Sequence, residues 1–382
     1  MSDSIRQVAF LDLKAQQARI APALRARLET VLGHCQFVLG PEVQELEARL
    51  AGFCGAAHCV GLSSGTDALQ IAMMAEGIGP GCAVFLPAFT YTATAEVPLL
   101  LGAIPVFVDI DPHTFQIDTA HLRARIDQVR AGGTLRPAAI IGVDLFGQPA
   151  PWPELRAIAG ENGLFLLDDC AQSFGGSLNG VRLGREADAT AISFFPSKPL
   201  GGYGDGGALL TDDADRAKLY RSLRSHGEGE TRYEVLRTGM NGRLDTLQAA
   251  VLLAKLDVFE AELARRDEIA RTYDAALAGR VAVPVRVADS ESAWAVYAVL
   301  LPNTAERDAM QAGLRSRGVP TAIYYPRPLH LQPAYRPHHD GAALPVSEDI
   351  SGRILALPIH PELTPEDVDH VIAAVLAQLQ QG

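Results

Sequence analysis

Short apolar runs and longer amphipathic stretches take turns along most of the chain. Runs of strand length, bounded by turn residues, lie at 59–62, 83–87, 104–111, 138–144, 164–169, 189–195 and 208–211. Stretches with helical periodicity lie at 20–50, 64–74, 119–128 and 153–160, and the first of them is divided by a turn at Gly40-Pro41, where proline can start a new helix. This alternation predicts an α/β fold with a mostly parallel sheet that helices cover on both faces.

The pattern changes in the last third of the chain. From Thr246 to about Ala278 it predicts one long, charged helix that joins two domains and has a solvated face, formed by Glu260, Glu262, Arg265, Arg266 and Asp267. A strand at 294–301, a helix at 306–317 and a proline-rich stretch at 324–330 follow. We therefore expect a large domain over residues 1–260, which includes the N-terminal helices, and a smaller C-terminal α/β domain over 261–382.

Composition narrows the class of protein. The 382 residues are 48% hydrophobic and carry a formal net charge of −12, which argues against a general nucleic-acid or anionic-membrane surface. No apolar run has spanning length, and Met1–Gln7 lacks a leader pattern, so we expect a cytoplasmic protein. Five cysteines without paired or metal-ligand spacing predict free, mostly buried thiols, with neither disulfides nor a zinc site.

One lysine lies in a glycine-rich turn between two predicted strands. Lys198 follows the run 189–195, and the strand 208–211 comes after the glycines. Gly202, Gly204 and Gly207 match G-x-G-x-x-G, but the dinucleotide fingerprint must open a helix, and here a strand follows. Lys198 is either a solvated turn charge or a nucleophilic amine held against a cofactor.

Two further positions are candidates for ligand contacts. The small residues before the helix at Gly65 place unpaired N–H groups where a phosphate can bind, although simple capping by Ser64 or Thr66 explains them equally well. Asp168 and Asp169 end a strand, where ligands collect in open α/β sheets, and side-chain alternation sends them to opposite faces. Only one of them is expected to face a ligand, and the alternative for either is loop capping.

Together these parts match the needs of pyridoxal phosphate. A lysine amine reacts with the aldehyde, and an ionised acid keeps the pyridine nitrogen protonated. Helix N–H groups and hydroxyls hold the phosphate, and an aromatic ring stacks on the cofactor.

Five motifs in order also resemble the DegT/DnrJ/EryC1/StrS sugar aminotransferases. They span residues 64–69, 87–91, 168–175, 193–198 and 241–245, and the similarity runs from about Phe10 to the C-terminus. The resemblance implies the aspartate-aminotransferase type of fold (fold type I). It also implies that Lys198 binds the cofactor and then moves protons, and that Asp169 pairs with the pyridinium.

The resemblance assigns the remaining site residues as well. The implied cofactor contacts are Gln172 beside the ring, Tyr91 stacked on it, Gly65, Thr66 and Ser193 at the phosphate, and Asn241 reaching the phosphate from a partner subunit. The implied substrate contacts are Arg243, Tyr324, Tyr325 and Phe89. Sharing of sites between chains implies a homodimer. Tyr324 and Ser64 stand where relatives often have histidine and asparagine, at positions that can tune which keto sugar is accepted.

Motifs at 193–207 and 325–329 are similar to enzymes that transfer an amino group from glutamate to UDP-2-acetamido-2-deoxy-3-oxo-glucuronate for surface polysaccharide. The alternative substrates are UDP- or dTDP-linked 3- or 4-keto-6-deoxysugars. Another alternative is a sugar dehydratase, but family members with that activity have histidine at the position of Lys198. A regulator without enzymatic activity is a third alternative, against which the intact Lys198 and Asp169 argue.

Overall fold

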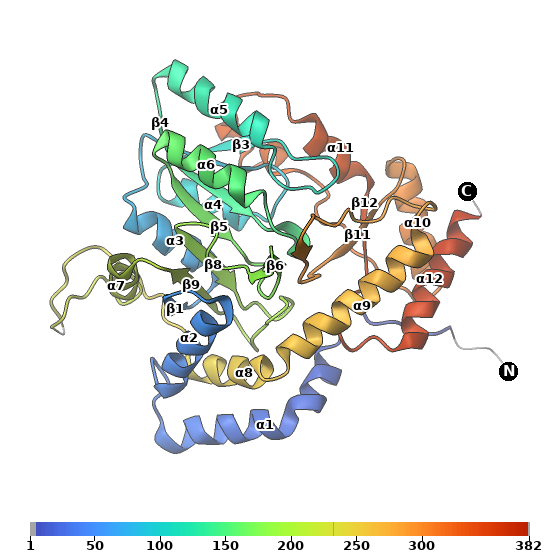
Figure 1. Ribbon diagram of the computed structural model, residues 1–382, viewed down its shortest axis with the longest axis horizontal. Helices are drawn as coiled ribbons and strands as arrows, with labels where there is room; N and C mark the ends of the chain where they lie inside the picture. Colours follow the sequence, from blue (N-terminus) through green and yellow to red (C-terminus); the bar gives the residue numbers. More distant parts are fainter. Residues whose placement is uncertain (1–4, 232, 381–382) are drawn as a thin grey trace.

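The computed structural model describes residues 5–231 and 233–380, so the first four residues of the expected large domain and the last two of the expected small domain lie outside the described residues. A seven-stranded sheet in the order β1-β9-β8-β5-β4-β2-β3 forms the centre of the larger part (Figure 1). Its strands are β1 (His58–Leu62), β2 (Cys82–Pro87), β3 (Ile104–Val108), β4 (Arg136–Val143), β5 (Phe165–Asp169), β8 (Ala189–Ser193) and β9 (Gly207–Thr211). Strands β3, β2, β4, β5 and β8 pair in parallel, whereas β9 is antiparallel to both of its neighbours, so the predicted mostly parallel sheet is confirmed.

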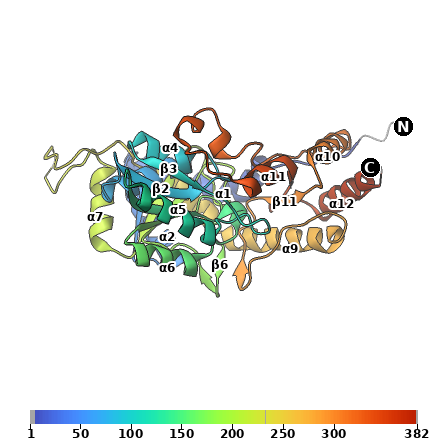
Figure 2. The same ribbon diagram turned by 90° about the horizontal axis from the view of Figure 1, so that it is seen from above.

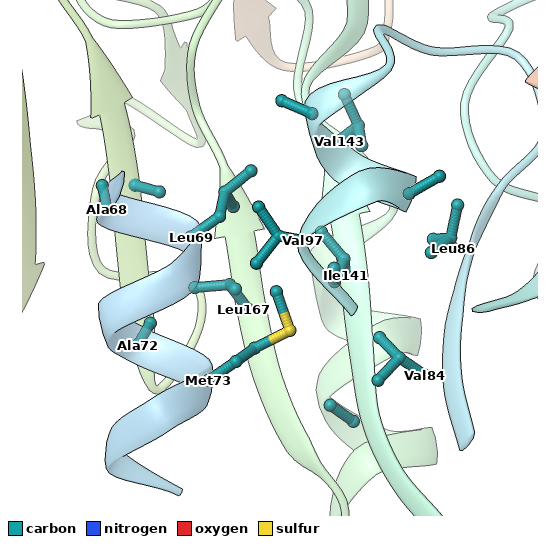
Figure 3. Packing of buried hydrophobic residues seen from close by; sticks show 14 of the residues in the cluster. Ala68, Leu69, Ala72, Met73, Val84, Leu86, Val97, Ile141, Val143 and Leu167 are labelled. Atoms are coloured by element: carbon teal, nitrogen blue, oxygen red, sulfur yellow. The ribbon is translucent and has the colours of Figure 1, made fainter. Parts of the chain in front are cut away.

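Helices cover both faces of this sheet because its strands are apolar on both sides. On β2, Val84 and Leu86 pack in the cluster of α3 and α4, while Ala83 and Phe85 belong to the opposite cluster with α5 and α6. Figure 3 shows Met73 of α3 packed toward the strands of the first face. The helices of this part are α1 (Leu13–His34), α2 (Pro41–Cys54), α3 (Gly65–Ala75), α4 (Ala93–Leu100), α5 (Thr119–Gly132), α6 (Trp152–Asn162), α7 (Ala214–Leu223) and α8 (Thr246–Leu256).

The long helix expected from Thr246 to Ala278 is two helices, so that prediction was wrong in part. α8 ends at Leu256, and α9 (Phe259–Leu277) begins after Asp257 and Val258. The expected solvated face is also wrong at two positions, since Glu262 and Arg266 are buried. The Glu262 carboxylate accepts hydrogen bonds from Gln16 Nε2, so this part of α9 faces α1 instead of solvent.

α9 leads from the large sheet to a smaller C-terminal unit at the other end of the elongated molecule (Figure 2). That unit contains β11 (Tyr297–Leu300) and β12 (Ile354–Leu357), which pair antiparallel, with α10 (Thr304–Ser316), α11 (Pro345–Arg353) and α12 (Pro365–Leu379). Its own apolar core joins residues of α9, β11, α10, β12 and α12. The division at residue 260 stays a prediction.

Short elements complete the described chain. A three-stranded sheet pairs β10 (Ser290–Glu291), β6 (Ser177–Leu178) and β7 (Val181–Arg182), and single 3₁₀ turns are η1 (Leu145–Gly147), η2 (Leu329–Leu331) and η3 (Arg336–His338). The thiols are free, as predicted, with Cys35 exposed and the other four buried. Within residues 5–231 and 233–380, we find no helix with the length and apolarity needed to cross a bilayer.

Candidate active site

A cavity of about 950 Å³ opens at the carboxyl edge of the parallel strands. Val143, Asp169 and Ser193, which end β4, β5 and β8, lie in its wall, and so does Gly65 at the start of α3. Ligand sites of open α/β sheets form at this edge, and the volume suits a cofactor together with a substrate. The fold therefore gathers residues that are far apart in the sequence around one space.

Lys198 and Asp169 both face this cavity. Ser193 lies opposite Gly207 in the β8–β9 pair, so residues 194–206 form the connection that carries Lys198. Removal from water lowers the pKa of the Lys198 ammonium, and the nearby Asp169 carboxylate acts in the opposite direction. This environment makes the neutral, nucleophilic amine more accessible near neutral pH.

Asp169 is a buried carboxyl group with defined partners. Its Oδ2 accepts a hydrogen bond from Thr94 Oγ1 at 2.8 Å, and its Oδ1 accepts one from the Ala171 N–H at 3.3 Å. Burial raises the pKa of Asp169, and the Thr94 hydroxyl and the charge on Lys198 both oppose that rise. These partners allow Asp169 to carry a negative charge when a cationic group of a ligand lies opposite it.

The start of α3 forms a narrow cradle. Ser64 caps the helix by accepting a hydrogen bond from the Asp67 N–H. This cap uses one N–H group of the first turn, so it does not conflict with phosphate binding by the others. A Cβ placed on Gly65 would lie 2.6 Å from the Ser193 Cβ, which real side chains do not tolerate. Gly65, Thr66 and Ser193 therefore present backbone N–H groups and a hydroxyl at close quarters in the cavity wall.

Gln172 links the cavity floor to a distant loop. Its Oε1 accepts a hydrogen bond from the Phe146 N–H at 2.9 Å, and its Nε2 donates to the Tyr325 hydroxyl at 3.1 Å. Tyr325 and Tyr324 both line the cavity. Phe89 does not: it is fully buried behind the wall, with its ring edge-on to Tyr325 at 5.8 Å, so the structure corrects its expected substrate contact to a supporting one.

The other expected residues fall into two groups. Tyr91 lines the cavity with a half-exposed ring, which leaves its face free to stack. Asn241 and Arg243 are absent from the cavity wall; instead their segment is hydrogen-bonded to the end of β1, where the Ser63 N–H donates to the Gly242 carbonyl. Within this chain they stand outside the cavity.

The opposite face of the sheet holds a buried acidic pair. Asp168 points away from Asp169, as expected from strand alternation, and atoms of Asp144, Asp168 and Cys170 lie within 4.8 Å of one another. Asp144 accepts hydrogen bonds from the Ala150 N–H, Trp152 Nε1 and Ser173 Oγ, whereas the Thr190 hydroxyl is the one polar neighbour among the described residues that acts to lower the pKa of Asp168 by hydrogen bonding. Burial and the neighbouring acid raise the pKa of Asp168 well above its ordinary value, so a proton is held here.

Three residues of the site were missed by sequence reasoning. Thr94 lay in the run that enters α4, but nothing local identified it as the partner of Asp169. Arg266 was placed on a solvated face, yet it is buried and reaches the cavity. Arg327 stood in the motif at 325–329 without a role of its own, and it too lines the cavity.

Comparison with known proteins supports the family expected from the motifs. The chain is 46% identical over 369 residues, 96% of this chain and 99% of the relative, to a UDP-2-acetamido-2-deoxy-3-oxo-D-glucuronate aminotransferase from Pseudomonas aeruginosa. A crystal structure of a DegT DnrJ EryC1 StrS aminotransferase from Brucella abortus is 47% identical, with a TM-score of 0.95 and coverage of 97% of this chain and 99% of that chain.

A more distant structure, NtdA from Bacillus subtilis with bound cofactor PMP, is 29% identical with a TM-score of 0.90, covering 100% of this chain and 87% of that chain. The expected fold class is confirmed by these structures. The model of the DegT/DnrJ/EryC1/StrS aminotransferase family matches residues 19–376, and the chain belongs to that family.

Proposed function

We propose that this protein is a pyridoxal-phosphate-dependent aminotransferase that moves an amino group from L-glutamate to UDP-2-acetamido-2-deoxy-3-oxo-glucuronate. The observation that carries the proposal is the placement of Lys198 and Asp169 in one cavity with the Gly65 cradle. The similarity to the Pseudomonas aeruginosa enzyme supports the choice of sugar. The product would be the 3-amino sugar, a precursor for surface polysaccharide such as lipopolysaccharide O-antigen.

The residues fit the cofactor on structural grounds. When bound, pyridoxal phosphate supplies an aldehyde carbon that takes over the amino group and a ring that takes up electrons. Asp169, with Thr94 behind it, favours a protonated pyridine nitrogen. The contact between Gly65 and Ser193 leaves room for a phosphate against the α3 N-terminus, and a side chain at position 65 would remove it.

Each remaining residue has a task in this proposal. Lys198 Nζ would hold the cofactor through its aldehyde and, once free, would accept and return the proton at the substrate carbon. Gln172 holds a position beside the ring because both ends of its amide are hydrogen-bonded. Tyr91 stacks on the ring, and Tyr324 and Tyr325 contact the sugar nucleotide from the cavity wall.

We further propose a homodimer in which Asn241 of one chain reaches the phosphate in the partner's cavity, with Arg243 near the substrate. Both residues stand outside their own cavity, which agrees with a role in another copy. Large apolar side chains are exposed near this segment at Phe37, Val38 and Leu247, and Val38 bridges to Asp245. Such exposed apolar groups are suited to burial between subunits. We assign the reaction to the cytoplasm.

The test is a mass-spectrometric assay of glutamate-dependent amination. The purified protein, loaded with pyridoxal phosphate, is given a panel of UDP- and dTDP-linked 3- and 4-keto sugars, and K198A serves as the inactive control. We expect an aminated product from the UDP-keto-uronate. Amination of a dTDP sugar alone would overturn the substrate, and a deoxy-ketone without nitrogen would indicate a dehydratase, which the lysine at position 198 argues against.

A further inference from the structure

Three cationic side chains line the cavity among the described residues: Lys198, Arg266 and Arg327. Both proposed substrates are anions, so the chain needs cations beyond the lysine that binds the cofactor. The contacts of each side chain decide which of them is available to bind a substrate anion. Lys198 is committed to the aldehyde.

Arg266 is committed to the protein. Its Nη1 donates to the carbonyl oxygens of Trp294 and Ile359, each at 3.1 Å, and the side chain is 4% exposed. It thereby ties α9 to the segment before β11 and to the segment after β12. The Arg266 Nε has no hydrogen-bond partner among the described residues, but the two bonds at Nη1 and the burial of the side chain leave the guanidinium little freedom to move toward a substrate.

Arg327 is free in this sense. Its guanidinium makes no hydrogen bond or ion pair with any described residue; its backbone carbonyl alone is used, as acceptor for Gln332 Nε2 at 3.4 Å. The side chain is exposed at the cavity wall. An arginine presents a planar set of donors that matches a carboxylate or phosphate in two parallel hydrogen bonds.

The loop that carries Arg327 is fixed against the site on both sides. The Leu329 N–H donates to the Ala88 carbonyl at 2.8 Å, and the Tyr325 hydroxyl accepts from Gln172. Pro326 and Pro328 flank the arginine and restrict its backbone. The loop therefore fixes the backbone position of Arg327, so binding of a ligand needs to order only its side chain.

We propose that Arg327 binds an oxyanion of the nucleotide sugar, not of the amino donor, and so determines affinity for that substrate; this rests on the function proposed above. The sugar carbon that receives nitrogen must lie near Lys198, so the rest of the long substrate extends outward past the exposed Arg327. Glutamate is short enough to lie within the cavity. Two oxyanions of the sugar nucleotide qualify, the C6 carboxylate of the uronate and the diphosphate.

The test compares R327Q and R327K with R336Q, a matched control. Arg336 is an exposed arginine in the next turn, absent from the cavity wall, and its side chain makes no hydrogen bond or ion pair within residues 5–231 and 233–380. The two half-reactions are measured separately by the absorbance of the bound cofactor, with glutamate alone and then with the keto sugar. Binding of the aminated sugar nucleotide, which needs no turnover, is measured by calorimetry.

We expect R327Q to raise the KM for the sugar and the Kd for its product by roughly 10–100-fold, as for loss of a charged hydrogen bond. R327K should lie between R327Q and the wild type, and R336Q should match the wild type. The glutamate half-reaction should not change. A loss confined to the uronate assigns the carboxylate, and an equal loss with the C6-hydroxymethyl analogue assigns the diphosphate; both support the proposal.

Two results would overturn it: R327Q binds both sugar nucleotides within about twofold of the wild type, or it slows the glutamate half-reaction. A wild type that aminates neither sugar refutes the proposed function separately. In that case calorimetry with the two aminated sugar nucleotides still decides, because unchanged binding in R327Q contradicts the role of Arg327.

Discussion

Thr94 donates its hydroxyl to the Asp169 carboxylate at 2.8 Å, which fixes the acid at the end of β5 to the first turn of α4. The same hydroxyl lies 3.4 Å from Thr90 Oγ1, so a short hydroxyl chain backs the carboxylate. This contact stabilises the ionised form of Asp169 against its burial. It is also independent of any ligand, so it prepares the acid before a cofactor binds.

Replacing Thr94 by valine keeps the shape and removes the hydroxyl. T94V should push the pKa of Asp169 further upward and weaken its pairing with a cationic ring, raising the Kd for pyridoxal phosphate by roughly tenfold. Titration of the apoprotein followed by cofactor absorbance measures it. T94S keeps the donor and should bind like the wild type; equal affinity of T94V and T94S would contradict this role.

Gly65 is a second position where the geometry makes a sharp prediction. In G65A the new Cβ would meet the Ser193 Cβ at 2.6 Å, so the cradle must widen. We expect cofactor affinity to fall at least tenfold and stability to fall by about 1–3 kcal/mol. Chemical denaturation and cofactor titration measure the two effects. The control is G52A in α2, where an added Cβ meets nothing within 4 Å; a G65A protein as stable and as well loaded as G52A would refute the cradle.

The Asp144–Asp168 pair predicts a pH dependence of stability. Burial, first of all, raises the pKa of Asp144 to about 7 and that of Asp168 well above the ordinary 3.8. The folded chain therefore binds protons at these two carboxyl groups more tightly than the unfolded chain does. Proton binding at the pair adds fully to the free energy of unfolding below about pH 4, and this stabilisation is lost as the pH rises through the pKa values of the folded state.

The matching variant is D168N, which stays neutral at every pH. Its midpoint of thermal unfolding should fall less steeply than that of the wild type between pH 6 and pH 9, and the difference between the two proteins should grow with pH. Melting followed by circular dichroism across this range measures it. Parallel curves for both proteins would show that Asp168 carries no shifted proton.

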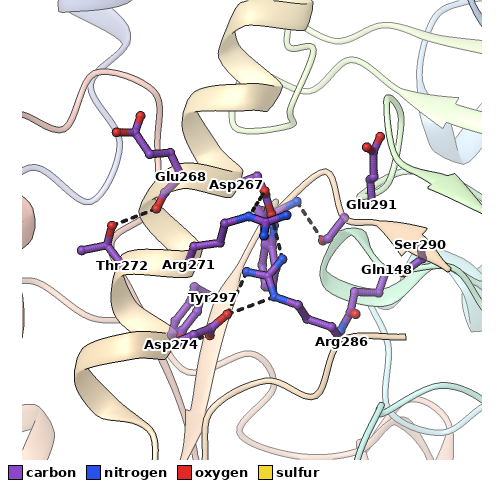
Figure 4. A network of polar contacts seen from close by, with 12 residues as sticks. Gln148, Asp267, Glu268, Arg271, Thr272, Asp274, Arg286, Ser290, Glu291 and Tyr297 are labelled. Atoms are coloured by element: carbon purple, nitrogen blue, oxygen red, sulfur yellow. Dashed lines mark hydrogen bonds and ion pairs between the residues drawn. The ribbon is translucent and has the colours of Figure 1, made fainter. Parts of the chain in front are cut away.

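Arg286 joins α9 to the segment that enters β11 (Figure 4). Its guanidinium donates to Asp267 Oδ1 at 2.8 Å and to Asp274 Oδ2 at 3.0 and 2.8 Å, and it lies over the Trp294 ring at 4.7 Å. Because several contacts are lost together, R286A should lower the free energy of unfolding by about 1–2 kcal/mol. R271A removes an exposed ion pair to the same Asp267 and should cost under about 0.5 kcal/mol. Equal losses in urea denaturation would contradict the network.

Local pattern was enough for the sheet and for the opposite orientation of the two acids that end β5, whereas the choice of Asp169 as the ligand-facing acid came from the family resemblance. The alternation of apolar runs and helices predicted the parallel strands, and side-chain alternation along β5 was sufficient to send Asp168 and Asp169 to opposite faces. These features depend on residues that are close in sequence. The roles of Gln172 and Asn241 came from resemblance, and they remain predictions.

Tertiary relationships were out of reach. The charges of Glu262 and Arg266 suggested solvent, because the local pattern contains no sign that α1 and the segments flanking β11 and β12 pack against α9. The expected contact of Phe89 failed for a similar reason, since its ring packs edge-on against Tyr325, 236 positions further along the chain, and Tyr325 lines the cavity while Phe89 is buried away from it. A substrate-binding role for Arg327 could be inferred only after the structure showed the partners of Lys198 and Arg266, the other cations in the cavity wall.

The central claim is that Lys198 carries the cofactor. The most direct measurement is borohydride reduction of the protein loaded with pyridoxal phosphate, followed by digestion and peptide mass spectrometry. We predict a stable phosphopyridoxyl mass on the peptide that contains Lys198, absent after prior addition of glutamate and absent in K198A. A label on another lysine, or an unlabelled Lys198 peptide in the loaded wild type, would contradict it.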